Sequence, residues 1–309
     1  MIVIVLVLLV VVLTYVRPRV LAQPPGVLAR LPMLAPVPAS ALTPPAPWRA
    51  TAVRAMPAWP ATLALARTET RRVLLSPLFT AAVVITVLNA VVMRATTEFA
   101  TFNSFALGGP AAFWAGLICY FAGHAAASRS RRSGTGEMFA PAPLSPRLRI
   151  LALALASLVA GAVIFVLLLA GYLYWWDVRD IAFTRPTIWH LLSTPVQVVG
   201  GFTFGVMLAT WAPWRGVAPA GFFGLVAVHV ILSNTGNPAW GAFYEYAKWP
   251  DQGGGFETLS AAWHLAYMAL LCAMAVVGAM VWLPGRRRGL LALGAALTLG
   301  ALGAGLAQF

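Results

Sequence analysis

Charged side chains are scarce in this sequence of 309 residues: aspartate, glutamate, lysine and arginine together make up 9% of it. A soluble globular domain carries about 25%. Because 61% of the residues are hydrophobic and the mean hydropathy is +0.83, the chain has too little charge to keep its apolar surface in water. Apolar stretches of about 20 residues, the length that crosses a bilayer as a helix, recur along it. The composition excludes a soluble domain and predicts an all-α, polytopic membrane protein.

Lysine is almost missing, since Lys248 is the only one. A phosphate loop needs a lysine beside the β- and γ-phosphates in the pattern G-x-x-x-x-G-K-[ST], so the Gly-Thr-Gly at residues 134–136 cannot be one. Cys119 and Cys272 stand inside apolar stretches, and we expect buried thiols rather than a disulfide or a metal pair. The four histidines have no catalytic or metal-binding spacing. No cofactor is expected.

Eight apolar segments can be delimited. They are residues 1–16, 74–93, 106–127, 150–174, 188–211, 216–234, 260–283 and 289–307. If all eight cross the membrane, 17 basic and 2 acidic residues fall on one side, and 4 basic and 6 acidic residues fall on the other. Because basic loops stay in the cytoplasm, we expect the arginine-rich side of this cell-membrane protein to be cytoplasmic. Both termini are then expected on the opposite, outward-facing side of the cell membrane. This asymmetry accounts for the net charge of +13 without nucleic-acid binding.

The chain divides into three expected parts. Residues 1–17 are expected to form an N-terminal transmembrane helix; a cleaved signal peptide is the alternative, but no basic residue precedes the apolar run. Residues 18–59 are rich in Pro, Ala and Arg, and prolines at this density preclude a continuous helix. They are expected to be a cytoplasmic linker. Residues 60–309 are expected to form the main transmembrane domain.

An amphipathic stretch opens this domain. In residues 60–76, apolar side chains alternate with Arg67, Glu69, Arg71 and Arg72. We expect a short helix in the membrane interface, with its arginines reaching the lipid headgroups. The alternative is the polar flank of a spanning helix.

Residues 129–149, a polar interruption between two apolar segments, have more order than a connector needs. Thr135 can cap a short helix, with Glu137 and Met138 in its first turn. Prolines, including Pro143, then end it. We expect a short surface helix flanked by arginines that docks in a groove of a partner protein.

Two stretches together resemble a known family. They are ARTETRRVLLSPLF, residues 66–79, and RRSGTGEMFAPAPLSPRLR, residues 131–149, separated by two apolar segments. This arrangement resembles the permease subunit of type-2 ABC transporters, in particular divergent actinobacterial members. TPVQVVGGFTFGVMLATW and WHLAYMALLCAM, further along, are similar to these permeases too. In the family, an elbow helix precedes six spans, and the first cytoplasmic loop forms a coupling helix that contacts the ATPase.

The resemblance implies a set of partner-coupling residues. They are Arg131, Arg132, Gly134, Thr135, Glu137, Met138 (where leucine is usual), Pro143, Leu144 and Ser145. It also implies an elbow helix over residues 60–76, a coupling loop over 129–149, and a dimer with a second copy or a homologous permease. ATP hydrolysis is then expected on a separate ATP-binding subunit, so this chain is not expected to be an enzyme, and the direction is expected to be export. Segments 1–16 and 289–307 are additional to the six-span plan.

Two other functions stay open at this point. A membrane-embedded enzyme would need an acid/base or metal cluster at one interface, and the sequence has no such pattern. A non-transporting membrane scaffold or sensor needs neither. A cytosolic ATPase that co-purifies with the chain would distinguish the transporter from both.

Overall fold

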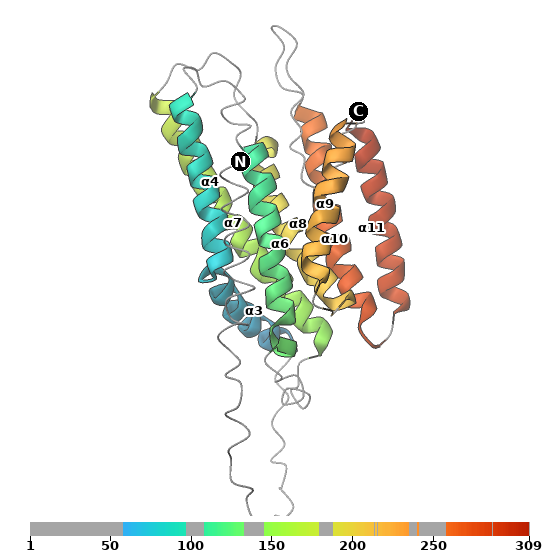
Figure 1. The fold of residues 1–309 in the computed structure, drawn as a ribbon. Helices are drawn as coiled ribbons and strands as arrows, with labels where there is room; N and C mark the ends of the chain where they lie inside the picture. The colour runs from blue at the N-terminus through green and yellow to red at the C-terminus, as the bar shows by residue number, and fades with distance from the viewer. Residues whose placement is uncertain are drawn as a thin grey trace, which may run out of the picture.

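The computed structural model is helical throughout the part of the chain that it describes. The described residues are 58–96, 108–132, 145–178, 188–212, 214, 216–234, 240, 258–285 and 287–308. Their helices are α3 (Ala58–Leu74), α4 (Pro77–Thr96), α6 (Gly108–Arg132), α7 (Pro146–Val178), α8 (Ile188–Trp211), α9 (Val217–Asn234), α10 (Thr258–Trp282) and α11 (Arg288–Ala307). Most run along one common direction, with α3 at one end of the bundle (Figure 1). These residues contain no strand, and for them the predicted all-α class is confirmed.

Four helical stretches are long and apolar enough to cross a membrane. They are Pro146–Gly171, Leu191–Trp211, Leu259–Trp282 and Arg288–Ala307. A fifth is obtained if Trp59–Leu74 and Pro77–Leu88, bent by 59° relative to each other, count as one span. Fewer helices qualify by length and composition than the eight crossings expected from the sequence. Helix α9 is short, and the last turns of α6 carry serine and arginine. Segment 1–16 lies outside the described residues.

Large apolar side chains lie exposed on the outer helices. They include Val84, Val87, Leu88 and Val91 of α4, Leu158, Val166 and Leu173 of α7, Phe223, Val228 and Ile231 of α9, and Leu291, Leu299 and Leu306 of α11. Soluble monomers do not expose apolar surface on this scale. Together with the long apolar helices, this surface has the character of a helical membrane protein.

Two Ser-Pro pairs begin helices. Pro77 is the first residue of α4 and Pro146 the first of α7, a position at which a helix needs no N–H donor. The Oγ atoms of Ser76 and Ser145 each accept a hydrogen bond from the amide nitrogen three residues later, at 3.2 Å and 3.3 Å. Both serines therefore act as N-caps. The first pair restarts the chain after α3 and produces the 59° bend.

Helices α6 and α8 form the centre of the bundle. Residues 115–124 of α6 are all buried. A Cβ atom at Gly201 of α8 would overlap the carbonyl oxygen of Gly116, and one at Gly205 would overlap that of Tyr120. The backbones can approach this closely only because both α8 positions are glycine. The glycines of VVGGFTFGVM thus let α8 pack in close contact with α6.

Polar contacts join the outer helices to this centre. The phenol of Tyr120 donates a hydrogen bond to the carbonyl oxygen of Ala218 in α9, at 2.8 Å. Near the C-terminus, Nδ1 of His264 lies 2.8 Å from Oε1 of Gln308, and both side chains are buried. His264 therefore joins the start of α10 to the end of α11.

Candidate coupling site

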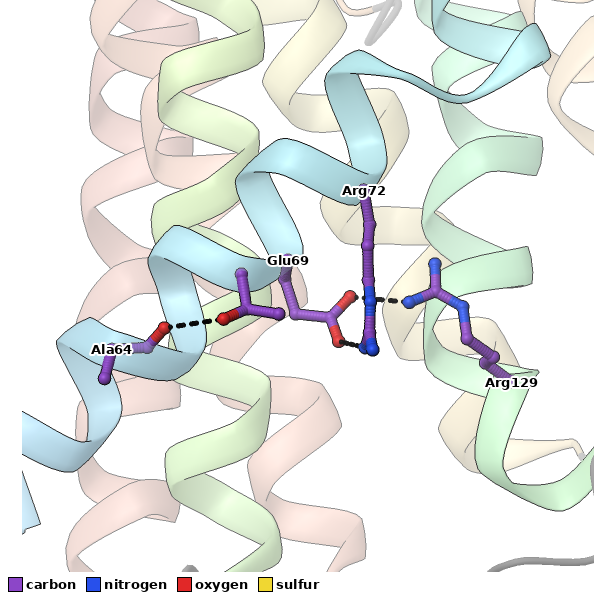
Figure 2. Close-up of polar contacts among 5 residues, drawn as sticks. Ala64, Glu69, Arg72 and Arg129 are labelled. Atoms are coloured by element: carbon purple, nitrogen blue, oxygen red, sulfur yellow. Dashed lines mark hydrogen bonds and ion pairs between the residues drawn. The ribbon is translucent and has the colours of Figure 1, made fainter.

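A buried carboxylate lies at the arginine-rich end of the bundle. Glu69 of α3 is only 4% exposed. One carboxylate oxygen accepts a hydrogen bond from Arg72 and the other from Arg129, each at 2.9 Å (Figure 2). Burying a carboxylate without a cationic partner is strongly unfavourable. The two arginines are therefore the cationic partners that the buried side chain of Glu69 requires.

The site joins segments that are far apart in the sequence. Arg72 lies one turn after Glu69 on α3, whereas Arg129 follows Glu69 by 60 residues and lies near the end of α6. Arg149, in the first turn of α7, lies close enough to interact electrostatically with all three. One carboxylate thus faces three guanidinium groups that come from three different helices.

The amphipathic pattern of α3 turns Glu69 toward the bundle. Ala66 and Val73, three residues before and four residues after Glu69, are buried on the same side of the helix. This side packs along α7. Arg67 and Arg71 are exposed on the other faces. The four polar residues expected in the elbow helix therefore separate into a buried acid with its partner arginine and two exposed arginines.

The first turn of α7 is also tied to the opposite side of the bundle. The guanidinium of Arg147 donates a hydrogen bond to the carbonyl oxygen of Leu283, at 3.4 Å. It lies against Gly285, whose φ of 124° favours glycine. This residue belongs to the turn between α10 and α11, which Figure 1 places at the same end of the bundle as α3. The start of α7 thus contacts both α3 and this turn.

The structure describes only part of the predicted coupling residues. Arg131 and Arg132 are the last residues of α6, and Ser145 is the N-cap of α7. The others, Gly134, Thr135, Glu137, Met138, Pro143 and Leu144, lie outside the described residues. The residues at the two ends of the predicted coupling loop are therefore located, while its docking helix stays a prediction.

The sequence pattern alone does not distinguish Glu69 from the arginines beside it. One signal is nevertheless present: Glu69 is the only acidic residue among the first 97. A single acid within a basic, amphipathic stretch is a candidate for a buried ion pair, because a buried carboxylate requires a cationic partner. The identity of the distant partner, Arg129, depends on how α3 packs against α6 and α7.

Among the residues that the structure describes, no group of three or more His, Cys, Asp or Glu side chains is placed to hold a metal ion. Both cysteines are free thiols: Cys119 is buried in α6, as expected, whereas Cys272 in α10 is only partly buried. The thiol of Cys272 donates to the carbonyl oxygen of Val196, at 3.6 Å.

Comparison with protein-family models, with curated proteins and with solved structures found no match. The geometry at the arginine-rich end and the sequence pattern of the loop are therefore the grounds on which a function can be proposed.

Proposed function

We propose that this chain is the membrane subunit of a type-2 ABC transporter, an exporter in the cell membrane. In this proposal it forms the translocation pathway as a dimer with a second copy or a homologous permease. A separate ATPase chain binds and hydrolyses ATP and pushes on the loop between α6 and α7. The resemblance of residues 66–79 and 131–149 to these permeases supports the proposal, and so does the ionic link between α3 and α6.

The ion pair between Glu69 and Arg129 is the observation that carries the proposal. It fastens α3 to α6 only a few residues before loop 133–144. Arg149, soon after the loop, faces the same carboxylate. Three helices are thus held together at the two ends of the predicted coupling loop. A force on the loop would act on all three at once, as coupling between an ATPase and a membrane pathway requires.

The membrane topology belongs to the same proposal. In it, α6 and α9 cross the bilayer along with the longer apolar helices. The low hydropathy of α6 is compatible with crossing, because residues 115–124 are enclosed by protein and not by lipid. The 18 residues of α9 rise about 27 Å, close to the ~30 Å of the hydrocarbon core. The end that carries α3 then faces the cytoplasm.

Glu137→Lys tests the coupling role, because it reverses the charge of the only acid in the loop. We expect the variant to insert into the membrane normally but to lose the ATPase subunit. The measurement uses the tagged full-length chain, expressed in its native cells and purified in detergent. Co-purified ATPase activity is assayed, and the associated chain is identified by mass spectrometry as an ATP-binding-cassette protein.

Glu245→Lys is the matched control, since the charge pattern assigns Glu245 to the opposite side of the membrane. It should retain the ATPase at the wild-type level. Retention by Glu137→Lys as well would refute the coupling assignment. If no ATP-binding-cassette protein accompanies even the wild-type chain, the transporter proposal is wrong, and a scaffold explains the fold better.

A further inference from the structure

Helices α8, α10 and α11 line a groove of about 560 Å³, with one contribution from α9. Apolar side chains form almost all of its wall, including Phe204, Met207, Met268 and Met274. This volume lies within the range of roughly 300–1,000 Å³ that is usual for pockets that take small ligands. Methionine side chains adapt their shape to flexible apolar partners. The groove is therefore large enough, and soft enough, for a hydrocarbon ligand.

The few polar side chains of the wall are already engaged with the backbone. The hydroxyl of Thr298 donates to the carbonyl oxygen of Gly294 at 2.9 Å, and the indole nitrogen of Trp211 donates to that of Gly278 at 2.9 Å. The thiol of Cys272 is likewise directed to a backbone carbonyl. A polar ligand would lose its hydrogen bonds to water here and gain few in return. A hydrocarbon chain loses none.

One end of the groove is strongly basic. Leu290 and Leu291, in the first turn of α11, belong to its wall. Arg287 and Arg288 precede them by three residues each, so they extend the same face of the helix. Both arginines are exposed, and no described acidic side chain forms an ion pair with them.

The groove also lies at a definite depth. The rings of Trp211 and Trp282 lie near this basic end with centroids 6.0 Å apart, and both residues are exposed, Trp282 more than Trp211. Tryptophan and arginine gather at the level of the lipid headgroups. From Leu290 to Thr298, α11 rises about 12 Å, close to the ~15 Å of hydrocarbon in one leaflet. The groove thus extends from a headgroup-level basic end across one leaflet.

We propose that this groove binds one anionic phospholipid of the leaflet at the arginine-rich end of the bundle. An acyl chain occupies the apolar groove, and Arg287 and Arg288 bind the phosphate of the headgroup. The charge of the arginines selects an anionic lipid over a zwitterionic one, since basic side chains at this level attract anionic headgroups. The proposal depends on the membrane location but not on an ATPase partner, so it stands or falls independently of the transport function.

Native mass spectrometry of the full-length chain in detergent tests the site. The chain is titrated with dioleoyl phosphatidylglycerol or, as the zwitterionic probe, dioleoyl phosphatidylcholine. We expect one tightly bound phosphatidylglycerol, preferred over phosphatidylcholine by about tenfold or more. The double variant Arg287→Gln/Arg288→Gln should bring the two lipids to nearly equal affinity. An unchanged preference in this variant would overturn the assignment of the headgroup site.

Two substitutions on α11 test the acyl-chain site. Gly294→Phe should fill the groove and weaken both lipids, because Gly294 belongs to its wall and has room for a side chain toward Val277. Gly303→Phe is the matched control, since a Cβ atom there meets nothing within 4 Å and the residue is outside the groove. It should bind both lipids like the wild type. Equal lipid binding by the two variants would refute the acyl-chain site. If Gly294→Phe instead loses a dimer without any change in lipid binding, the groove belongs to the contact with a second copy of the chain.

Discussion

Substituting Glu69 by glutamine removes the carboxylate of the candidate coupling site and keeps the shape of the side chain. The carboxylate accepts two charge-assisted hydrogen bonds, and each such bond contributes about 1.5–3 kcal/mol when it is shielded from water. Here the carboxylate is shielded, but the side chains of Arg72 and Arg129 are 54% and 41% exposed. Exposed ion pairs contribute only about 0.2–1 kcal/mol. For the two bonds together, these values give about 0.4–2 kcal/mol if they are exposed and about 3–6 kcal/mol if they are shielded. Because both arginines are substantially exposed, we expect the local stability of α3 to fall by about 2 kcal/mol, the upper end of the exposed range.

Hydrogen–deuterium exchange of the α3 amides measures this loss locally. A change of about 2 kcal/mol corresponds to roughly a 30-fold increase in the opening equilibrium. In the regime in which exchange follows that equilibrium, amides of residues 62–74 should exchange about 30-fold faster in Glu69→Gln. Amides in α8 and α10 should be unaffected, because neither helix contributes to the ion pairs.

A double-mutant cycle separates the ionic link from simple loss of packing. Arg129→Gln should accelerate exchange in α3, although it lies on a different helix, and Glu69→Gln/Arg129→Gln should be less than additive. Arg67→Gln is the control on the same helix, since Arg67 is exposed and is not one of the two arginines that pair with Glu69. Its effect should stay below about threefold. Additive effects of Glu69→Gln and Arg129→Gln would show that the two side chains are not coupled, and the ionic link between α3 and α6 would be refuted.

Two further substitutions test the packing that surrounds the site. Gly201→Ala should lower the free energy of unfolding of the detergent-solubilised chain by about 1–3 kcal/mol, because its Cβ atom overlaps the carbonyl oxygen of Gly116. Gly224→Ala, where a Cβ atom meets nothing within 4 Å, should not destabilise the chain. Equal melting curves for the two variants would contradict the close approach of α6 and α8. Ser145→Ala should weaken the start of α7 by about 1 kcal/mol and accelerate exchange at the Leu148 amide about fivefold, whereas unchanged exchange there would contradict the capping role.

The helical class could be predicted because it follows from composition. Seven of the expected apolar segments, from 74–93 to 289–307, coincide with helices to within a few residues at most ends. In a chain with so few charges, long apolar runs have to form helices that satisfy their own backbone hydrogen bonds. The glycine contacts of α8 could be predicted for a related reason, since glycines within an apolar helix favour close packing.

The ion pairs and the groove could not be predicted in the same way. The pairing of Glu69 with Arg129 depends on the 59° bend that directs α3 across the bundle, and the bend arises from a two-residue Ser-Pro signal. The groove depends on where α11 packs against α10, which apolar composition does not specify. Both features are products of tertiary packing and not of any local pattern.

The packing also determines how a push on loop 133–144 would spread. Its first end is α6, whose backbone rests against Gly201 and Gly205 of α8, so α6 and α8 have to move as one body. Its second end is α7, which Arg147 joins to the turn between α10 and α11. Helix α9 packs only lightly against this centre, and its backbone accepts the hydrogen bond of Tyr120. If the proposed function is correct, α9 is therefore the helix we expect to change its position most relative to α6 and α8 when the pathway opens.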